Sequence, residues 1–169
     1  MMQRLLEQDA QLSTSLRFAE QSSIIRTLAV ILAHSGDSWF WLLGLGLVWL
    51  LGDPGWKHRV VVMAAGVVLT AVIVMLVKFS VRRRRPEGQW GQIYRSTDPH
   101  SFPSGHAARV VMLAILAQAL GPAWFAGALL LWAPLVGLAR VMMGVHYLSD
   151  IIAGMVLGIV MGLAVLQLF

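Results

Sequence analysis

Residues 59–79 read RVVVMAAGVVLTAVIVMLVKF, and they establish what kind of chain this is. No charge occurs between Arg59 and Lys78. An α-helix needs about 20 mostly apolar residues to cross the hydrocarbon core of a bilayer. The stretch therefore predicts a membrane-spanning helix.

The composition of the whole chain agrees with this prediction. Of its 169 residues, 58% are hydrophobic and 12% are charged, and the mean hydropathy is +0.74. A soluble domain is about half apolar and about a quarter charged, so this chain has too few charges to cover an aqueous surface. Cysteine is absent, which excludes disulfides and thiolate chemistry. We expect an all-α integral membrane bundle formed by a single domain, residues 1–169.

Further spans lie downstream, at 104–121 continuing into 123–140, and at 146–168. Gly121-Pro122 is a strong breaker, so it separates two antiparallel helices. Upstream, residues 22–51 hold two shorter apolar runs that can form two tilted spans, or one span plus a helix packed against the bundle. We favour two, which gives about six transmembrane helices.

The N-terminal segment, residues 1–20, is polar and mixed in charge, without the apolar run and cleavage site of a signal peptide. Leu5, Leu6, Leu12 and Leu16 form a rough apolar stripe. The segment is expected to be a surface helix lying at the membrane interface, and the alternative is a frayed polar tail.

One long connection, residues 82–102, lacks apolar periodicity and contains four consecutive arginines at 82–85. Loops of this length in a compact domain are usually functional or disordered. We interpret it as an active-site loop, because ionisable residues gather in and around it.

Following the clear spans through the membrane places the ends of three helices and this loop at one face. Ionisable groups at a membrane face are costly and usually mark a functional site. The residues gathered there are Lys78, Arg82, Arg83, Arg84, Arg85, His100, Ser104, His106, Arg140, His146 and Asp150.

Several of these residue types suit a phosphate. Lys78 and Arg85 share a face if their helix continues to the stop before Pro86. Ser104 and Gly105 open a helix, where backbone N–H groups and the positive helix end attract anions. Arg140 can hold phosphate oxygens with two hydrogen bonds.

His146 and Asp150 are four residues apart and therefore lie on one helix face. A carboxylate on one imidazole nitrogen leaves the other nitrogen as a nucleophile or base. The pair can also be a buried polar link between helices. A metal is disfavoured, since the other nearby carboxylates are chiefly Glu87 and Asp98 and the surrounding cations would repel it.

The spaced residues Lys78-x6-Arg85-Pro86, Pro103-Ser104-Gly105-His106 and Arg140-x5-His146-x3-Asp150 resemble the three-part signature of the type 2 phosphatidic acid phosphatase superfamily. The third motif of that family often begins Ser-Arg, whereas here it is Ala139-Arg140. This departure removes a hydroxyl that can support the phosphate site but keeps the arginine.

The resemblance implies a metal-independent phosphatase without a cofactor. According to this resemblance, His146 attacks phosphorus to form a phosphohistidine, and Asp150 orients the His146 ring. His106 protonates the leaving group and then activates water. The same resemblance assigns the phosphate oxygens to Lys78, Arg85, Arg140, Ser104 and the amide of Gly105. Arg82, Arg83 and Arg84 are outside the signature and can recruit anionic lipid or a diphosphate, or remain solvated.

The expected substrate is a lipid phosphate or diphosphate, such as phosphatidic acid, phosphatidylglycerol phosphate or a polyprenyl diphosphate of the undecaprenyl type. The expected partners are this lipid and the bilayer, and not nucleic acid; no oligomeric state is indicated. Two other functions use the same residues, namely a non-catalytic anionic-lipid transporter or scaffold and a lipid phosphotransferase.

The resemblance also implies a multi-pass protein of the bacterial inner membrane, with an extracytoplasmic active site and both termini inside. The positive-inside rule, applied to residues 82–85, predicts the opposite side. We give the rule less weight here, because some of these arginines are needed for phosphate.

Overall fold

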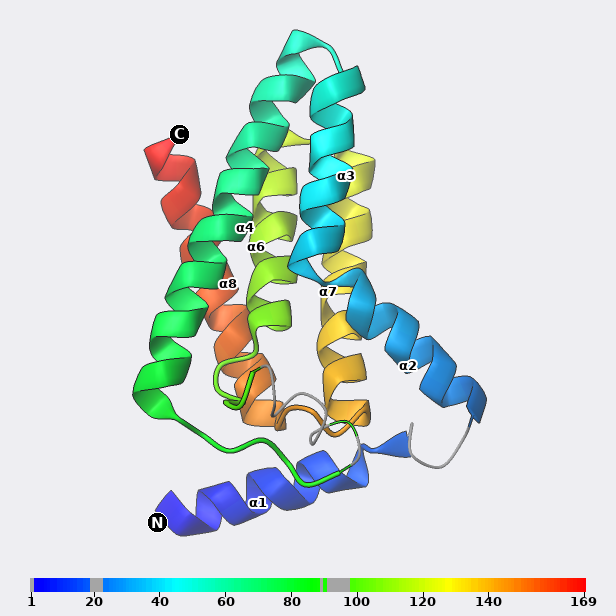
Figure 1. The fold of residues 1–169 in the computed structure, drawn as a ribbon, viewed down its shortest axis with the longest axis vertical. Helices are drawn as coiled ribbons and strands as arrows, with labels where there is room; N and C mark the ends of the chain where they lie inside the picture. The colour runs from blue at the N-terminus through cyan, green and yellow to red at the C-terminus, as the bar shows by residue number, and fades with distance from the viewer. Residues whose placement is uncertain (1, 19–22, 89, 91–97) are drawn as a thin grey trace.

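The computed structural model describes residues 2–18, 23–88, 90 and 98–169, and its elements are helices. Figure 1 shows them as an elongated bundle with a short helix across one end. In chain order the helices are α1 (Met2–Ser15), α2 (Ser23–Ser35), α3 (Ser38–Leu51), α4 (Pro54–Val81), α6 (Gly105–Leu120), α7 (Ala123–Met142) and α8 (Leu148–Leu168).

Local chemistry sets the helix ends. Asp53 caps α4 by accepting a hydrogen bond from the Trp56 amide at 3.0 Å, and Pro54 occupies the first turn, where its missing N–H costs nothing. Ser104 caps α6 by accepting from the Ala107 amide. At the start of α8, the Asp150 carboxylate reaches back to the Tyr147 amide at 2.9 Å.

Helix α6 forms the centre of the bundle and packs against α4, α7 and α8. The α6–α8 contact is close because glycines line it: a Cβ added at Gly154 would come 2.5 Å from the carbonyl oxygen of Ser104, the cap of α6, and one added at Gly158 would clash with the carbonyl oxygen of Ala108. Small residues permit this approach of two backbones. The outer faces of the bundle carry exposed apolar side chains such as Leu51, Leu76 and Leu131, as a lipid-facing surface requires.

All six expected apolar segments are helical, which confirms the helical bundle. Judged by length and composition within the described residues, α4, α7 and α8 are each long enough to cross a membrane, and α6 is a shorter apolar helix. Helices α2 and α3 meet this criterion only together, as a pair bent by 57°. Residues 23–51 thus form two helices, each shorter than a full span.

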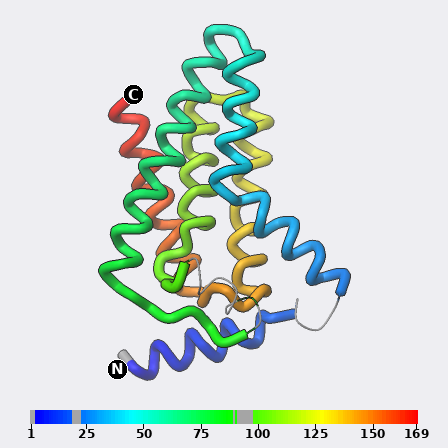
Figure 2. Tube along the Cα trace, viewed as in Figure 1, coloured from blue at the N-terminus to red at the C-terminus, as the bar shows by residue number. Residues whose placement is uncertain are grey.

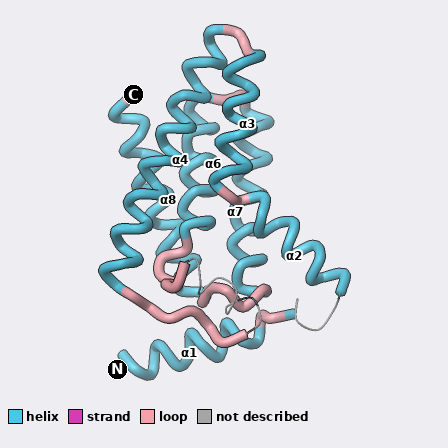
Figure 3. The backbone as a smooth tube through the Cα atoms, viewed as in Figure 1, coloured by secondary structure: helices cyan, strands magenta, loops and turns pink. Residues whose placement is uncertain are grey.

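The chain does not reverse direction at the α2–α3 break. Both helices run away from the end of the bundle where the loops gather, as the traces in Figures 2 and 3 show. Helix α1 lies near that end, and the C-terminal end of α8 lies away from it (Figure 1). The bend of 57° between α2 and α3 thus continues the path of the chain instead of forming a hairpin.

The expected N-terminal helix is present as α1 and is docked on the start of α8. Ser13 is 1% exposed, and its hydroxyl accepts a hydrogen bond from the Leu148 amide at 2.9 Å. Asp9 accepts from the Ser149 amide at 3.0 Å. Leu5 and Leu12 remain exposed, which suits a helix that lies along a membrane surface.

Candidate active site

The longer loops of the bundle gather at one end, beside α1 (Figure 3). Hydrogen bonds bring ionisable residues of the chain together there. Lys78 projects from the last turn of α4 and is 3% exposed; its ammonium donates to the Asp98 carboxylate and to the His100 carbonyl, the latter at 3.0 Å. Arg85 is 2% exposed and donates to an oxygen of the same Asp98 carboxylate at 2.7 Å. One carboxylate thus holds both cations.

The route by which Arg85 reaches the site differs from the expected helix register. Helix α4 ends at Val81, and Arg82 has a left-handed backbone with φ 54°. The chain then runs extended, with a bridge between Arg84 and His100. Lys78 and Arg85 are together because Asp98 binds both, and not because they share a helix face.

His146 lies in the turn between α7 and α8 and is 1% exposed. Its Nδ1 atom is 3.5 Å from Asp150 Oδ2, and its Nε2 atom is 3.3 Å from Arg85 Nη1. The expected pairing of His146 with Asp150 is therefore present. The Nε2 atom faces the cationic residues, so it is the ring nitrogen placed to meet an anion.

Burial lowers the pKa of His146 well below its usual value, and the charges of Arg85, Arg140 and Lys78 lower it further. Burial acts because removing an imidazolium from water is costly, and the cations act by repulsion. The ring is consequently neutral near pH 7, with a lone pair available on Nε2.

One alternative from the sequence was that Arg83 remains solvated. The structure instead gives its guanidinium protein partners. Its guanidinium donates to Asp150 Oδ1 at 2.7 Å, to Ser149 Oγ at 2.6 Å and to Asp9 Oδ2 at 2.7 Å. It also stacks 4.0 Å from the centre of the Tyr147 ring. Arg83 thereby links α1 to the carboxylate behind His146.

His106 lies in the first turn of α6, and its Nε2 atom is 2.6 Å from Asp37 Oδ1. The neighbouring Ser104 is fully buried; its amide donates to the Asp150 carbonyl at 3.0 Å while its hydroxyl caps α6. These bonds tie the start of α6 to the start of α8. Gly105 follows as the first residue of α6, at the positive end of that helix.

Arg140 is in the last turn of α7 and is fully buried. Its charge acts on both histidines, and also on Lys78 and Arg85. The structure therefore places Lys78, Arg85, His106 and His146 within range of the Arg140 charge, and Asp150 within range of Arg85. Within the part of the chain that the structure describes, no three His, Asp or Glu side chains form a cluster that could hold a metal ion.

Three residues of this region were missed as site residues by the sequence reasoning. Asp37 binds His106, Asp98 binds the two cations, and Arg83 binds Asp150. The position of Asp37 in the sequence indicates a paired acid. It lies in the polar break between two apolar runs, and an acid at that depth is costly unless it is paired.

Comparison with known proteins identifies the family. Residues 59–169 match the model of the PAP2 superfamily. The decaprenylphosphoryl-5-phosphoribose phosphatase of Mycobacterium tuberculosis is 32% identical over 132 residues, which cover 78% of this chain and 73% of that protein. The lipid A 1-phosphatase of Rhizobium etli is 29% identical, over 83% of this chain and 69% of the relative. The chain belongs to the PAP2 superfamily.

Two solved structures share the fold. The crystal structure of Aquifex aeolicus LpxE aligns with a TM-score of 0.74 and 22% identity, covering 93% of each chain. The Bacillus subtilis PAP2-type phosphatidylglycerolphosphate phosphatase aligns with a TM-score of 0.71 and 19% identity, covering 98% of this chain and 86% of that one. These findings confirm the family, the all-helical membrane fold and the enzyme class, a membrane phosphatase of lipid phosphates.

Proposed function

We propose that this protein hydrolyses a lipid phosphate by a two-step mechanism in which His146 is the nucleophile, His106 the acid and base, and Asp150 the residue that orients His146. The observation that carries this proposal is the setting of His146. Its ring is buried and neutral, with Asp150 behind Nδ1 and Arg85 beside Nε2. A nucleophile aimed into a cluster of cations suits attack on a phosphate.

In the first step, the lone pair of His146 Nε2 forms a bond to phosphorus while the bond from phosphorus to the lipid oxygen breaks. The leaving oxygen takes a proton from the imidazolium of His106, so a neutral lipid alcohol departs. In the second step, neutral His106 accepts a proton from water as the water oxygen attacks phosphorus. The phosphorus–nitrogen bond then breaks, and inorganic phosphate and neutral His146 are formed.

The cations stabilise the charge that develops on the phosphoryl oxygens. Phosphoryl transfer depends mainly on positioning and electrostatic stabilisation. We assign this role to Lys78, Arg85 and Arg140, with the Ser104 hydroxyl and the Gly105 amide at the positive end of α6. Substrate phosphate would share Lys78 and Arg85 with Asp98, which binds both of them.

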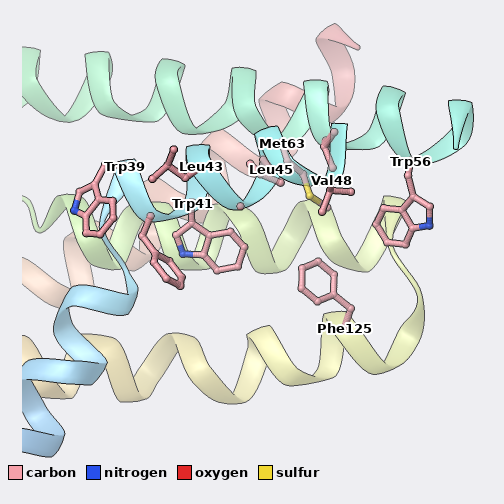
Figure 4. Close-up of a pocket in the computed structure, with 11 residues that line it drawn as sticks. Trp39, Trp41, Leu43, Leu45, Val48, Trp56, Met63 and Phe125 are labelled. Carbon is pink, nitrogen blue, oxygen red and sulfur yellow. The ribbon is translucent and has the colours of Figure 1, made fainter. Parts of the chain in front are cut away.

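An apolar cavity of about 550 Å³ supports a substrate with a long hydrocarbon chain. Figure 4 shows it along α3, with side chains of α4 and α7 on either side. Its lining includes Trp39, Trp41, Leu45, Met63 and Phe125. The Trp39 indole donates to Asp37 at 3.2 Å, so the cavity begins next to the residue that binds His106.

A second cavity, of about 590 Å³, is lined in part by Arg85. Its cationic lining suits an anionic head group. Arg82, Arg84, His100 and Tyr147 are among its lining residues. The relatives are named as phosphatases of decaprenylphosphoryl-5-phosphoribose and of lipid A, and both names denote lipids that carry a phosphate. We propose that the substrate is a lipid of this kind.

The decisive assay measures phosphate release from a panel of lipid monophosphates and diphosphates by the purified protein in detergent with EDTA. We expect at least one lipid to be hydrolysed, since the proposed mechanism needs no metal. Lipid binding without turnover would contradict hydrolysis and favour a carrier. Transfer of phosphate to an added lipid alcohol, without inorganic phosphate, would favour a phosphotransferase.

The same assay on intact bacterial spheroplasts tests the proposed extracytoplasmic site. Hydrolysis of an added short-chain lipid phosphate before permeabilisation is the expected result. Activity that appears only after permeabilisation would place the site in the cytoplasm.

The variant Gly44→Leu tests the apolar cavity. Gly44 lines it, and a Cβ added there meets no atom within 4 Å, so a leucine side chain has room to begin there and extend into the cavity. We expect KM for a long-chain lipid phosphate to rise about 10-fold, because roughly one or two buried methylene groups per chain lose their place, while KM for a short-chain analogue stays unchanged.

Gly46→Leu is the matched control. Gly46 is on the same helix and also has open space around its added Cβ, but it lines a different cavity. It should leave both KM values unchanged. Equal increases for both chain lengths in Gly44→Leu would show that the cavity does not hold the hydrocarbon chain.

A further inference from the structure

We infer that Asp37 is a positioning residue for His106, so that each active-site histidine is paired with its own carboxylate. This inference rests on the proposed function. Asp37 lies in the break between α2 and α3, 69 residues before His106, and outside the family match at 59–169. The two side chains are mostly buried, each 17% exposed, and are joined at 2.6 Å.

The break that carries Asp37 is held by three hydrogen bonds from neighbouring residues. Arg109 of α6 donates to the Gly36 carbonyl. Trp132 of α7 donates to Ser35 Oγ at 2.8 Å, and Trp41 of α3 donates to the Ser35 carbonyl at 2.9 Å. Gly36 itself is buried against α6 and α7. The backbone before Asp37 is therefore fixed against the two helices that carry His106 and Arg140.

The other oxygen of the Asp37 carboxylate is also bound. Oδ2 lies 3.0 Å from His34 Nδ1 and accepts from the Trp39 indole at 3.2 Å. Oδ1 is left for His106. The carboxylate is thus held from the α2 side and the α3 side, with its remaining oxygen directed at α6.

The charges around His106 require such a partner. The charges of Arg109 and Arg140 both act on the ring. The Asp37 carboxylate supplies the opposing negative charge, while His34 faces the carboxylate on its exposed side. An imidazolium at position 106, which the first chemical step consumes, is therefore stabilised by Asp37.

The hydrogen bond also selects the reactive nitrogen. With Nε2–H donating to Asp37, the proton for the leaving group is carried by Nδ1, and Nδ1 takes a proton from water in the second step. Asp37 does not touch the substrate in this scheme. It orients the ring and supports its charged form, as Asp150 orients the ring of His146.

The variant Asp37→Asn distinguishes this role from a structural one through the leaving group. A lipid alkoxide needs a proton to depart, whereas the 4-nitrophenolate ion departs without one. We expect kcat/KM for a lipid phosphate to fall about 10²-fold, the low end of the effect of a positioned general acid. We expect the value for 4-nitrophenyl phosphate to fall less than about 5-fold, since kcat/KM reports only steps up to the departure of the leaving group.

The ratio of these two values, measured on one preparation, does not depend on the folded fraction. Two further variants complete the design. In a His106→Ala background, Asp37→Asn should cause little additional loss, because residues that act as a unit are not additive. Asp37→Glu should recover part of the lipid activity. Asp53→Asn, at a carboxylate that caps α4, is the control and should behave as wild type.

Three outcomes would overturn the inference while leaving the proposed function intact: unchanged lipid activity in Asp37→Asn, an equal loss with both substrates, or a full additional loss in the His106→Ala background. Failure of the proposed function is distinguishable, because the wild-type protein would then release no phosphate from any substrate.

Discussion

Replacing His146 by alanine is expected to lower phosphate release by about 10⁵-fold, in line with the large losses that follow removal of a nucleophile. The residual rate would come from substrate binding and the cations, since loss of a nucleophile usually leaves these contributions in place. His146 is buried and neutral, and the chain has no cysteine to substitute for it.

Trapping of the intermediate provides the measurement. Wild-type protein mixed with a ³²P-labelled lipid phosphate and quenched in base should carry label that is stable to alkali and lost in acid, as a phosphohistidine is. The His146→Ala protein should carry none. His58→Ala, at an exposed histidine near the start of α4, is the control. Label retained in the His146 variant would assign the nucleophile to another residue.

Replacing Arg140 by methionine is expected to lower kcat by about 10²–10³-fold, the usual cost of removing one donor to a developing oxyanion. Arg140 is fully buried, and its charge acts on His106, His146, Lys78 and Arg85. Because these neighbours are largely cationic or neutral, an anion that binds among them should stabilise the fold.

Thermal unfolding in detergent checks the binding role independently of turnover. Inorganic phosphate should raise the Tm of the wild-type protein, since a ligand that binds only the native state stabilises it. The shift should be absent in Arg140→Met and retained in Arg59→Met, at a residue near the other end of the bundle that stacks on Trp56. An equal Tm shift in both variants would remove Arg140 from the phosphate site.

Much of the site could be predicted from local patterns. The His146–Asp150 pair follows from a spacing of four residues at a helix start, and the geometry contains it. Following the spans through the membrane placed Lys78, His106 and Arg140 at one face, which requires only the lengths of apolar runs. These predictions succeeded because helical periodicity and hydrophobic length act over short distances in the chain.

The role of Arg83 could not be predicted from local patterns. Its partners Asp9 and Asp150 are 74 and 67 residues away, and no pattern in the run at 82–85 separates it from Arg82 and Arg84. Helix α4 ends at Val81, and the extended chain beyond it turns Arg83 toward α1 and α8. A helix through these residues, as the sequence permitted, would have directed the same side chains elsewhere.

The amino-acid sequence by itself determined the membrane-embedded helical bundle, the face on which the charges gather and the identity of the phosphatase signature. Hydropathy, helix breakers and short spacings are sufficient for these conclusions. Only the tertiary structure decided which acid serves which base: Asp37 for His106, Asp98 for Lys78 and Arg85, and Arg83 for Asp150. Pairs of this kind depend on how separate helix ends and loops pack against one another. That packing cannot be predicted from any short segment of the sequence, because the paired residues lie far apart in the chain.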